Sequence, residues 1–343
     1  MVRKRVTIKE VAKRAGVSIS TVSRVLNSRD NKYIREVTRN KVMQAVKELN
    51  YKPDRRAQSL RGVATKIIGL IIPNRLNPYF EQVAQAIEEV CFDEGYGILL
   101  CSSNNNQKRE SIYLDLLEKQ KVDGIVISTV GLTRERFNEL ISRGIPVVLI
   151  DEDVPGVNAP AVFANNYMGG CQATQYLIQL GHERIAFISG PIDLLSSRER
   201  YRGYRDTLAK EGIKVGKELF KEGSFTYESG YRATWELLDE RNKFTAIFCS
   251  NDLMAFGAIR AIQDKGEKVP RDYSIVGFDD MYFSSISNPQ LTTVAQPVKE
   301  MAFRAFIALK EQIAEGFSHE KSHQFLDTKL IVRESCRSLD KTK

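Results

Sequence analysis

The sequence lacks the features of a membrane protein and of a disulfide-bonded secreted domain. No run of about 18 consecutive apolar residues occurs in the 343-residue chain, which excludes a membrane-spanning helix. The basic first residues, 1–5, are not followed by the apolar segment of a secretory signal. The five cysteines are widely spaced and form no CxxC pair, which is typical of reduced thiols. We therefore expect a cytoplasmic protein with no membrane partner.

Motifs of the common α/β enzymes are also missing. No GxGxxG follows the first predicted strand, and neither GxxxxGK[ST] nor GxSxG occurs in the chain. Residues 319–323, HEKSH, match the HExxH pattern of zinc proteases, but they lie in a polar stretch and the only other histidine is His182. Zinc chemistry needs both histidines on one helix face and a third ligand. We interpret residues 319–323 as a solvated loop and expect no enzyme activity, no cofactor and no metal.

The positive charge of the protein is concentrated at its N-terminal end. The chain has a formal net charge of +8, from 51 basic and 43 acidic side chains. Residues 1–62 contain 17 basic and 5 acidic side chains, a net charge of +12, so the remaining 281 residues carry −4. A basic module joined to a mildly acidic body predicts that the module binds a polyanion. A solvated basic face is the alternative interpretation.

Apolar residues at helical spacing predict three short helices in this basic module. The three sets are Ile8, Val11, Ala12 and Ala15, then Val22, Val25 and Leu26, and then Val42, Ala45, Val46 and Leu49. Thr7 and Glu10 form a capping box before the first helix, Gly16 ends it, and Ser18 can cap the second. Two short helices joined by a turn of about four residues that contains glycine predict a helix-turn-helix.

The second helix carries the side chains that we expect to contact DNA. A helix fits the major groove, and its N-terminal residues reach the base edges. Arginine can bond guanine through two hydrogen bonds, Ser and Thr hydroxyls suit phosphates, and isoleucine can contact a thymine methyl group. The candidates are Ile19, Ser20, Thr21, Ser23 and Arg24. A small helical domain that contacts protein is the alternative.

Residues 7–27, TIKEVAKRAGVSISTVSRVLN, resemble the DNA-binding domain of the lactose-repressor (LacI/GalR) family of bacterial transcription regulators. Residues 38–62 resemble the third helix and the hinge of that family. The resemblance implies a homodimer on a near-palindromic, double-stranded DNA operator, with further DNA contacts at Thr7 and Asn27. It also implies a hinge helix that inserts Leu60 into the minor groove as an apolar wedge. A buried linker contact is the alternative for Leu60. Arg35 stands where the family usually places a helix-capping residue such as Ser.

From residue 66 short apolar segments alternate with helical ones, which predicts an α/β body with parallel sheets. Runs such as IIGLII and PVVLI are apolar throughout, as expected of strands buried on both faces. We divide the chain into a DNA-binding domain (1–50), a hinge helix and linker (51–65) and a two-lobed effector-binding and dimerisation core (66–343). The predicted strands are Ile67–Pro73, Gly97–Ser102, Gly124–Ser128, Val147–Asp151, Ala161–Asn165, Ile185–Gly190, Ala246–Asn251, Ser274–Asp279 and Thr293–Gln296, with a last strand near Ile331.

Polar and aromatic residues follow almost every predicted strand, where ligands of open α/β sheets bind. Aromatic rings stack on the C–H faces of a sugar or on a nucleobase, while Asp, Asn, Gln and Arg bond hydroxyl groups. The body resembles the periplasmic sugar-binding-protein fold of the LacI/GalR family, and most of all its ribose- and purine-type members. That resemblance places effector contacts at Asn77, Tyr79, Phe80, Asp151, Arg198 or Arg200, Phe225, Asn251, Asp279 and Gln296.

Each of these positions also has a purely structural alternative. Aromatic residues near strand ends are often core residues, Asn251 and Asp279 can cap helices, and Arg200 can pair with a surface acid. We interpret Asp252 and Asp280 as caps or supports rather than as ligand contacts. Glu152 stands where ribose-binding relatives carry Arg, which argues against ribose as the effector.

Together these features predict a dimeric transcription repressor whose DNA binding is controlled by a small molecule. We expect a neutral sugar that closes the two lobes and so shifts the DNA-binding population. The alternatives are a purine effector, a phosphoprotein co-regulator, a sugar-binding transport protein or a sugar-acting enzyme. No heptad tail follows the last predicted strand, so we expect a dimer and not a tetramer joined through its tails.

Overall fold

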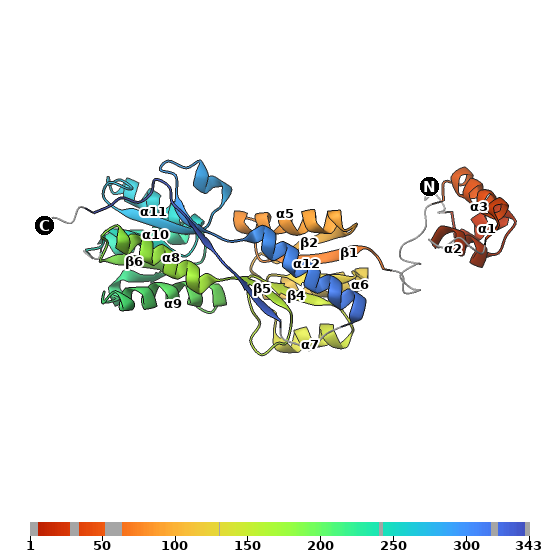
Figure 1. The fold of residues 1–343 in the computed structure, drawn as a ribbon, viewed down its shortest axis with the longest axis horizontal. Helices are drawn as coiled ribbons and strands as arrows, with labels where there is room; N and C mark the ends of the chain where they lie inside the picture. Colours follow the sequence, from red (N-terminus) through yellow and green to blue (C-terminus); the bar gives the residue numbers. More distant parts are fainter. Residues whose placement is uncertain are drawn as a thin grey trace. The chain divides into compact units, whose positions relative to one another are not determined.

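The computed structural model describes residues 6–27, 34–51, 64–129, 131–239, 243–316 and 322–339. Contacts divide the chain into two compact units, Met1–Thr65 and Lys66–Lys343 (Figure 1). The first is built of helices and the second of two predominantly parallel sheets with helices on their faces. The predicted fold class is therefore confirmed.

The N-terminal unit is a three-helix domain with its own small core. Its helices are α1 (Ile8–Ala15), α2 (Ile19–Asn27) and α3 (Glu36–Glu48). The three predicted apolar sets meet in one cluster, in which Val11, Val22 and Val42 are fully buried. Because each helix contributes one fully buried valine, none of the three can bury its apolar face alone.

The helix ends follow the local signals in the sequence. The backbone N–H of Thr7 donates to the Glu10 carboxylate at 2.6 Å, which completes the predicted capping box. Gly16 ends α1 in the left-handed conformation, with φ +69°. The Ser18 hydroxyl accepts the backbone N–H of Thr21 at 3.1 Å and so caps α2. Arg35 precedes α3 without making a side-chain cap.

The second unit consists of two lobes, each formed around a sheet of six strands among the described residues. The sheet of the N-terminal lobe has the order β11-β5-β4-β3-β1-β2, and all its pairings are parallel. Its strands are β1 (Ile67–Ile72), β2 (Gly97–Ser102), β3 (Gly124–Ile127), β4 (Val147–Ile150), β5 (Ala161–Ala164) and β11 (His323–Leu326). One apolar core lies on each face of the sheet. Helices α5 (Pro78–Asp93) and α12 (Val298–Glu315) pack on one face, and α6 (Gln107–Gln120) and α7 (Arg134–Ser142) on the other.

The C-terminal lobe repeats this architecture with the order β12-β10-β9-β8-β6-β7. Only the β10–β12 pairing of this sheet is antiparallel among the described strands. The strands are β6 (Ile185–Ser189), β7 (Phe220–Glu222), β8 (Ala246–Cys249), β9 (Ser274–Asp279), β10 (Thr292–Ala295) and β12 (Lys329–Ile331). Helices α8 (Asn166–Gln179) and α9 (Leu195–Lys210) cover one face, and α10 (Tyr227–Asp239) and α11 (Asp252–Asp264) the other. Two short 3₁₀ helices, η1 (Lys217–Leu219) and η2 (Tyr282–Ser285), complete the lobe.

Among the described residues the chain passes between the lobes three times. It crosses at Asn165 after β5, at Gln296 and Pro297 after β10, and at Asp327 and Thr328 after β11. Segments distant in sequence therefore lie side by side: α12 packs against α5, and Figure 1 shows both on the N-terminal lobe. Three narrow connections between two separately packed lobes are the structural requirement for a hinge.

The predicted strands are present, but most were predicted one or two residues too long at their carboxyl ends. Asp151, for example, has φ +73° and has already turned out of the extended conformation. Two short strands, β7 and β11, were missed because neither has a continuous apolar run. The solvated-loop interpretation of residues 319–323 is wrong for His323, which begins β11 and lies edge-on to the Phe163 ring. Residues 319–321 lie outside the described part of the chain.

Candidate functional site

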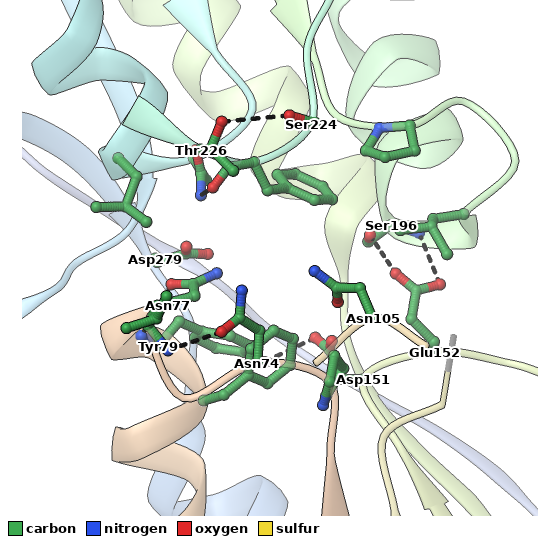
Figure 2. Close-up of a pocket in the computed structure, with 18 of the residues that line it drawn as sticks. Asn74, Asn77, Tyr79, Asn105, Asp151, Glu152, Ser196, Ser224, Thr226 and Asp279 are labelled. Carbon is green, nitrogen blue, oxygen red and sulfur yellow. Dashed lines mark hydrogen bonds between the residues drawn. The ribbon is translucent and has the colours of Figure 1, made fainter. Parts of the chain in front are cut away.

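A cavity of about 610 Å³ lies where the carboxyl ends of the strands in the two lobes face each other (Figure 2). This volume is within the range of about 300–1,000 Å³ that is usual for small-molecule sites. Eight of the ten residues predicted from the sequence line it, four from each lobe: Asn77, Tyr79, Phe80 and Asp151, and Arg200, Phe225, Asn251 and Asp279. Parallel strands all deliver their carboxyl ends to one edge, which explains why residues far apart in sequence meet here.

The other two predicted residues do not line the cavity. Arg198 is exposed, and its guanidinium donates to the Asp193 carbonyl at 2.6 Å. Of the two arginines named from the sequence, only Arg200 therefore reaches the cavity. Gln296 lies behind the cavity wall in the second crossing segment, where it bonds two of the lining residues.

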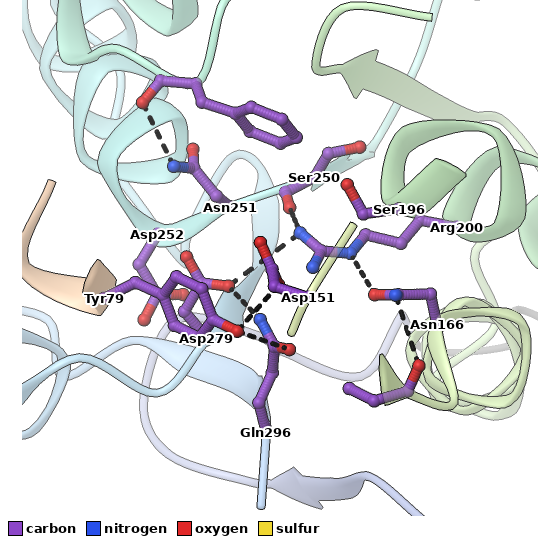
Figure 3. A network of polar contacts seen from close by, with 12 residues as sticks. Tyr79, Asp151, Asn166, Ser196, Arg200, Ser250, Asn251, Asp252, Asp279 and Gln296 are labelled. Atoms are coloured by element: carbon purple, nitrogen blue, oxygen red, sulfur yellow. Dashed lines mark hydrogen bonds and ion pairs between the residues drawn. The ribbon is translucent and has the colours of Figure 1, made fainter. Parts of the chain in front are cut away.

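A chain of hydrogen bonds connects the lobes through Gln296 (Figure 3). The Tyr79 hydroxyl is 2.7 Å from Asp151 Oδ1 and 3.2 Å from Gln296 Oε1. Gln296 Nε2 donates to Asp279 Oδ1 at 2.8 Å, and Asp279 forms an ion pair with Arg200 at 3.8 Å. Tyr79 and Asp151 belong to one lobe and Asp279 and Arg200 to the other, so the network passes through a hinge segment.

Arg200 is a buried cation, which contradicts the alternative that pairs it with an acid at the surface. Its Nε donates to Asn166 at 2.8 Å and its Nη1 donates to the Ser250 carbonyl at 2.5 Å. The guanidinium also lies 3.8 Å from the centre of the Phe278 ring. These contacts fix its position beside Asp279, where it offsets part of the cost of burying that carboxylate.

The three buried carboxyl groups of the cavity, those of Asp151, Glu152 and Asp279, have raised pKa values. Burial raises the pKa of Asp279 well above its usual range, although Arg200 opposes the shift. Burial likewise raises the pKa of Asp151, against hydrogen bonds from Tyr79 and Ser128 and the charge of Arg200. It also raises the pKa of Glu152 to about 7, with the nearby Asp151 charge adding to the effect. A ligand that donates hydrogen bonds would stabilise all three carboxylates.

Three cavity residues have left-handed backbone conformations that only glycine adopts without strain. They are Asp151 at φ +73°, Phe225 at φ +59° and Asp279 at φ +115°. Non-glycine residues in this region cost about 1–3 kcal/mol each and are concentrated at functional sites. All three were effector candidates in the sequence analysis, and Asp151 and Asp279 lie at the ends of the buried strands β4 and β9.

Two of the four asparagines that line the cavity, Asn77 and Asn251, are also helix caps. Asn77 Oδ1 accepts the N–H of Tyr79 at 3.1 Å at the start of α5, and Asn251 Oδ1 accepts the N–H of Met254 at 2.9 Å at the start of α11. The capping alternative is thus correct for Asn251, although this residue also lines the cavity. Asp279 ends a strand and bonds Gln296 instead of capping a helix.

Asp252 and Asp280, which we interpreted as caps or supports, bond to protein groups and do not line the cavity. Asp252 is fully buried and accepts the N–H of Met281 and the hydroxyls of Ser284 and Thr293. Asp280 pairs with Arg333 at 2.6 Å. Both hold the loop that follows β9, directly after Asp279.

Fourteen of the 22 lining residues were not among the predicted contacts, and the two buried polar ones are Glu152 and Ser196. Glu152 directly follows Asp151 at the end of β4, and Ser196 lies in the first turn of α9. The position of Glu152 after a strand end was a usable signal. No comparable signal indicates Ser196, because the sequence before α9 contains no capping pattern that would show where the helix begins.

The candidate DNA contacts lie at the start of α2. Ile19, Ser20 and Arg24 are exposed and Thr21 and Ser23 are half-buried. Thr7 is exposed and serves the capping box of α1. The side chain of Asn27 and all of Leu60 lie outside the described residues. The described part of α2 therefore presents hydroxyl groups and one guanidinium on the face that is not used for the core.

In the described parts of the chain no group of three or more His, Cys, Asp or Glu side chains is arranged to hold a metal ion. No described helix is long and apolar enough to cross a membrane.

A helix-turn-helix unit joined to a two-lobed α/β body with a cavity between the lobes defines a class of ligand-responsive transcription regulator. Residues 65–324 match the model of the periplasmic binding proteins and sugar binding domain of the LacI family, and residues 7–54 match the model of the bacterial regulatory proteins of the lacI family. The chain belongs to the LacI family and is a DNA-binding transcriptional repressor, not an enzyme. The family predicted from the sequence is confirmed.

Relatives match along the whole chain. The HTH-type transcriptional repressor PurR of Histophilus somni (strain 129Pt) is 36% identical over 336 residues, which are 97% of this chain and 99% of that protein. The PurR of Pasteurella multocida (strain Pm70) is 36% identical over 333 residues, with the same coverage.

Among solved structures, the lac repressor dimer bound to operator and the anti-inducer ONPF has a TM-score of 0.85 at 29% identity, covering 97% of this chain and 100% of that one. The complex of the transcriptional regulator CelR with cellobiose has a TM-score of 0.71 at 33% identity, covering 96% and 100%.

Proposed function

We propose that a neutral sugar, bound in the cavity between the lobes, controls DNA binding by this repressor. The observation that carries the proposal is the excess of carboxylates in the buried wall. Asp151, Glu152 and Asp279 face the cavity with one buried guanidinium, that of Arg200. Hydroxyl groups of a ligand donate hydrogen bonds to such acceptors and bring no negative charge into the cavity. The raised pKa values of the three acids indicate that this wall does not favour additional negative charge.

The aromatic lining suits the same ligand class. Tyr79 and Phe80 come from one lobe and Phe225 comes from the other. The polar groups lie beside these rings, so a ring-shaped polyol can place its C–H faces on carbon and its hydroxyls on oxygen and nitrogen. Solved relatives include complexes with cellobiose and with ribose.

A purine is the second candidate. The curated relatives carry the name PurR, and Phe80 and Phe225 line the cavity from opposite lobes, as a flat base between two rings would require. A nucleobase offers fewer donors to the carboxylates than a sugar does, and for that reason we place it second.

The hinge explains how ligand binding can reach the DNA-binding unit. A ligand that contacts Asp151 in one lobe and Asp279 in the other favours one separation of the lobes. Gln296 bonds the residues on both sides and lies in a crossing segment, so it moves with either lobe. A shift in lobe separation changes the DNA-competent population only if the ligand binds one state more tightly than the other.

We further propose that the repressor binds a near-palindromic operator as a homodimer, with α2 in the major groove and Leu60 at the minor groove. Each lobe exposes a set of large apolar side chains that a second copy could cover. In the N-terminal lobe these are Leu100 on the edge strand β2 and Ile112 and Leu116 on α6. In the C-terminal lobe they are Tyr282, Phe283 and Ile286, after β9.

Thermal unfolding of the full chain against neutral mono- and disaccharides, sugar phosphates and nucleobases tests the ligand class. A ligand at about 100 times its dissociation constant stabilises the protein by about 2.7 kcal/mol, which raises the midpoint by a few degrees. A shift with a neutral sugar supports the proposal. A shift with a purine nucleobase and with no sugar would transfer the proposal to the purine class.

A further inference from the structure

The N-terminus of α9 has no cap from its own lobe. Its N-cap residue is Leu194, which makes no side-chain hydrogen bond, and its first turn contains no acidic residue. The first N–H groups of a helix have no partner within the helix, and they carry partial positive charge. A 16-residue helix that faces a cavity therefore needs another group to satisfy this end.

Glu152 of the opposite lobe supplies that group (Figure 2). Its Oε2 accepts the backbone N–H of Leu195 at 2.9 Å and that of Ser196 at 3.4 Å, and its Oε1 accepts the Ser196 hydroxyl. The side chain is 5% exposed and lines the cavity. The bonded residues are 43 and 44 positions apart in the sequence and belong to different lobes.

We propose that Glu152 determines which effectors the cavity admits, because its carboxylate fills the anion position at the start of α9 and joins the two lobes before any ligand binds. This inference rests on the proposed function, since it assumes that the effector enters this cavity. It adds that the effector is uncharged at the α9 end, and that Glu152 is a specificity-determining and positioning residue.

The exclusion of anions follows from charge and space together. A helix N-terminus is a ready site for phosphate or carboxylate, but here both the N–H groups and the Ser196 hydroxyl already face a carboxylate. Asp151 is the neighbouring acid and adds to the negative potential, while Arg200 is the cation that acts on Glu152. A sugar phosphate would have to displace Glu152 or lie against it.

The hydrogen bonds from Glu152 to Leu195 and Ser196, here called the clasp, hold the two lobes together at the cavity. The hydrogen bonds of Gln296 run through a crossing segment, whereas those of Glu152 pass directly from lobe to lobe. Separating the lobes therefore leaves α9 without its cap.

Hydrogen–deuterium exchange of the ligand-free full-length protein tests the clasp. In Glu152→Ala we expect exchange to be about five- to tenfold faster in the first turn of α9, the effect of losing one cap. We also expect faster exchange in the crossing segments at residues 165–167, 296–298 and 327–329. Glu152→Gln, which keeps the side-chain shape, should change exchange in the same direction by less.

Glu222→Ala is the matched control. Glu222 accepts the N–H of Ile192 at 3.1 Å, so it bonds the same loop before α9 but from within the C-terminal lobe. It should loosen that loop and leave the crossing segments unchanged. Equal exchange of the crossing segments in Glu152→Ala and wild type would overturn the clasp and leave Glu152 an ordinary cap.

Titration calorimetry with inorganic phosphate at pH 8 tests the exclusion of anions. We expect no binding at millimolar phosphate in wild type and Glu222→Ala, and measurable binding in Glu152→Ala. Absence of binding in Glu152→Ala, with its melting transition intact, would overturn the exclusion. Neither experiment uses an effector, so both can succeed when the sugar panel fails, and the failure of each is separate from the failure of the proposed function.

Discussion

Replacing Tyr79 with Phe removes one oxygen from the centre of the hydrogen-bond network and leaves the ring in place. The Tyr79 hydroxyl is 2.7 Å from Asp151 and is 3.2 Å from Gln296, in a side chain that is 3% exposed. Its loss leaves the buried carboxylate of Asp151 with a weak bond to Ser128, at 3.4 Å, and the more distant charge of Arg200. Hydrogen bonds to charged groups contribute about 1.5–3 kcal/mol. We expect Tyr79→Phe to lower the free energy of unfolding by about 2 kcal/mol.

Tyr204→Phe provides the comparison. The Tyr204 hydroxyl is equally buried and donates to the uncharged carbonyl of Ile185 at 2.7 Å. A neutral hydrogen bond contributes about 0.5–1.5 kcal/mol, so this variant should lose about half as much stability. Chemical denaturation of both ligand-free variants at pH 8 measures the difference. If Tyr79→Phe is no less stable than Tyr204→Phe, the hydroxyl does not serve an ionised carboxylate and the electrostatic reasoning about this cavity is wrong.

The remaining predictions concern DNA, effector and pH. Arg24→Ala should weaken operator binding by about 1–3 kcal/mol in fluorescence anisotropy and relax specificity at one base pair; equal affinity for all sequences tested would contradict it. Phe225→Ala should abolish the response to the effector and leave the operator affinity of the ligand-free protein unchanged; a normal response would show that the aromatic wall is not used. The raised pKa of Glu152, about 7 against 4.5, means that the folded state binds more protons than the unfolded state between these values. Wild type should therefore lose stability relative to Glu152→Gln as pH rises from 4.5 to 7, with no further change above; a constant difference would refute the shift.

Local patterns in the sequence determined most of the fold. Each helix of the DNA-binding unit has its own apolar set, and its ends are set by residues within four positions, such as Thr7 with Glu10 and Ser18 with Thr21. Central strands of the body such as β1 and β4 are buried on both faces, so they appear as apolar runs whatever their neighbours are. The candidate residues at the strand ends lie together in one cavity because the parallel strands of each sheet have their carboxyl ends at the same edge.

The orientation of α9 decided which of two arginines, Arg198 or Arg200, faces the cavity, and the sequence had left both as candidates. Arg198 and Arg200 are two positions apart on α9, so they point to nearly opposite sides of the helix. Arg200 is buried at the cavity, and Arg198 is exposed. The sequence alone gives no phase for α9 because its apolar residues form no clear stripe.

The long-range contacts within and between the lobes were decided by the tertiary structure alone. The bond from Glu152 to the start of α9, the bridge through Gln296 and the addition of β11 to the first sheet join segments from 43 to more than 200 positions apart. Periodicity reports only which face of a segment is buried, and it is silent on which distant segment covers that face. The sequence by itself thus determined the two units, most of their elements and eight residues of the cavity lining, because these depend on local spacing and on strand ends. How the lobes are joined depended on long-range packing, which only the folded chain defines.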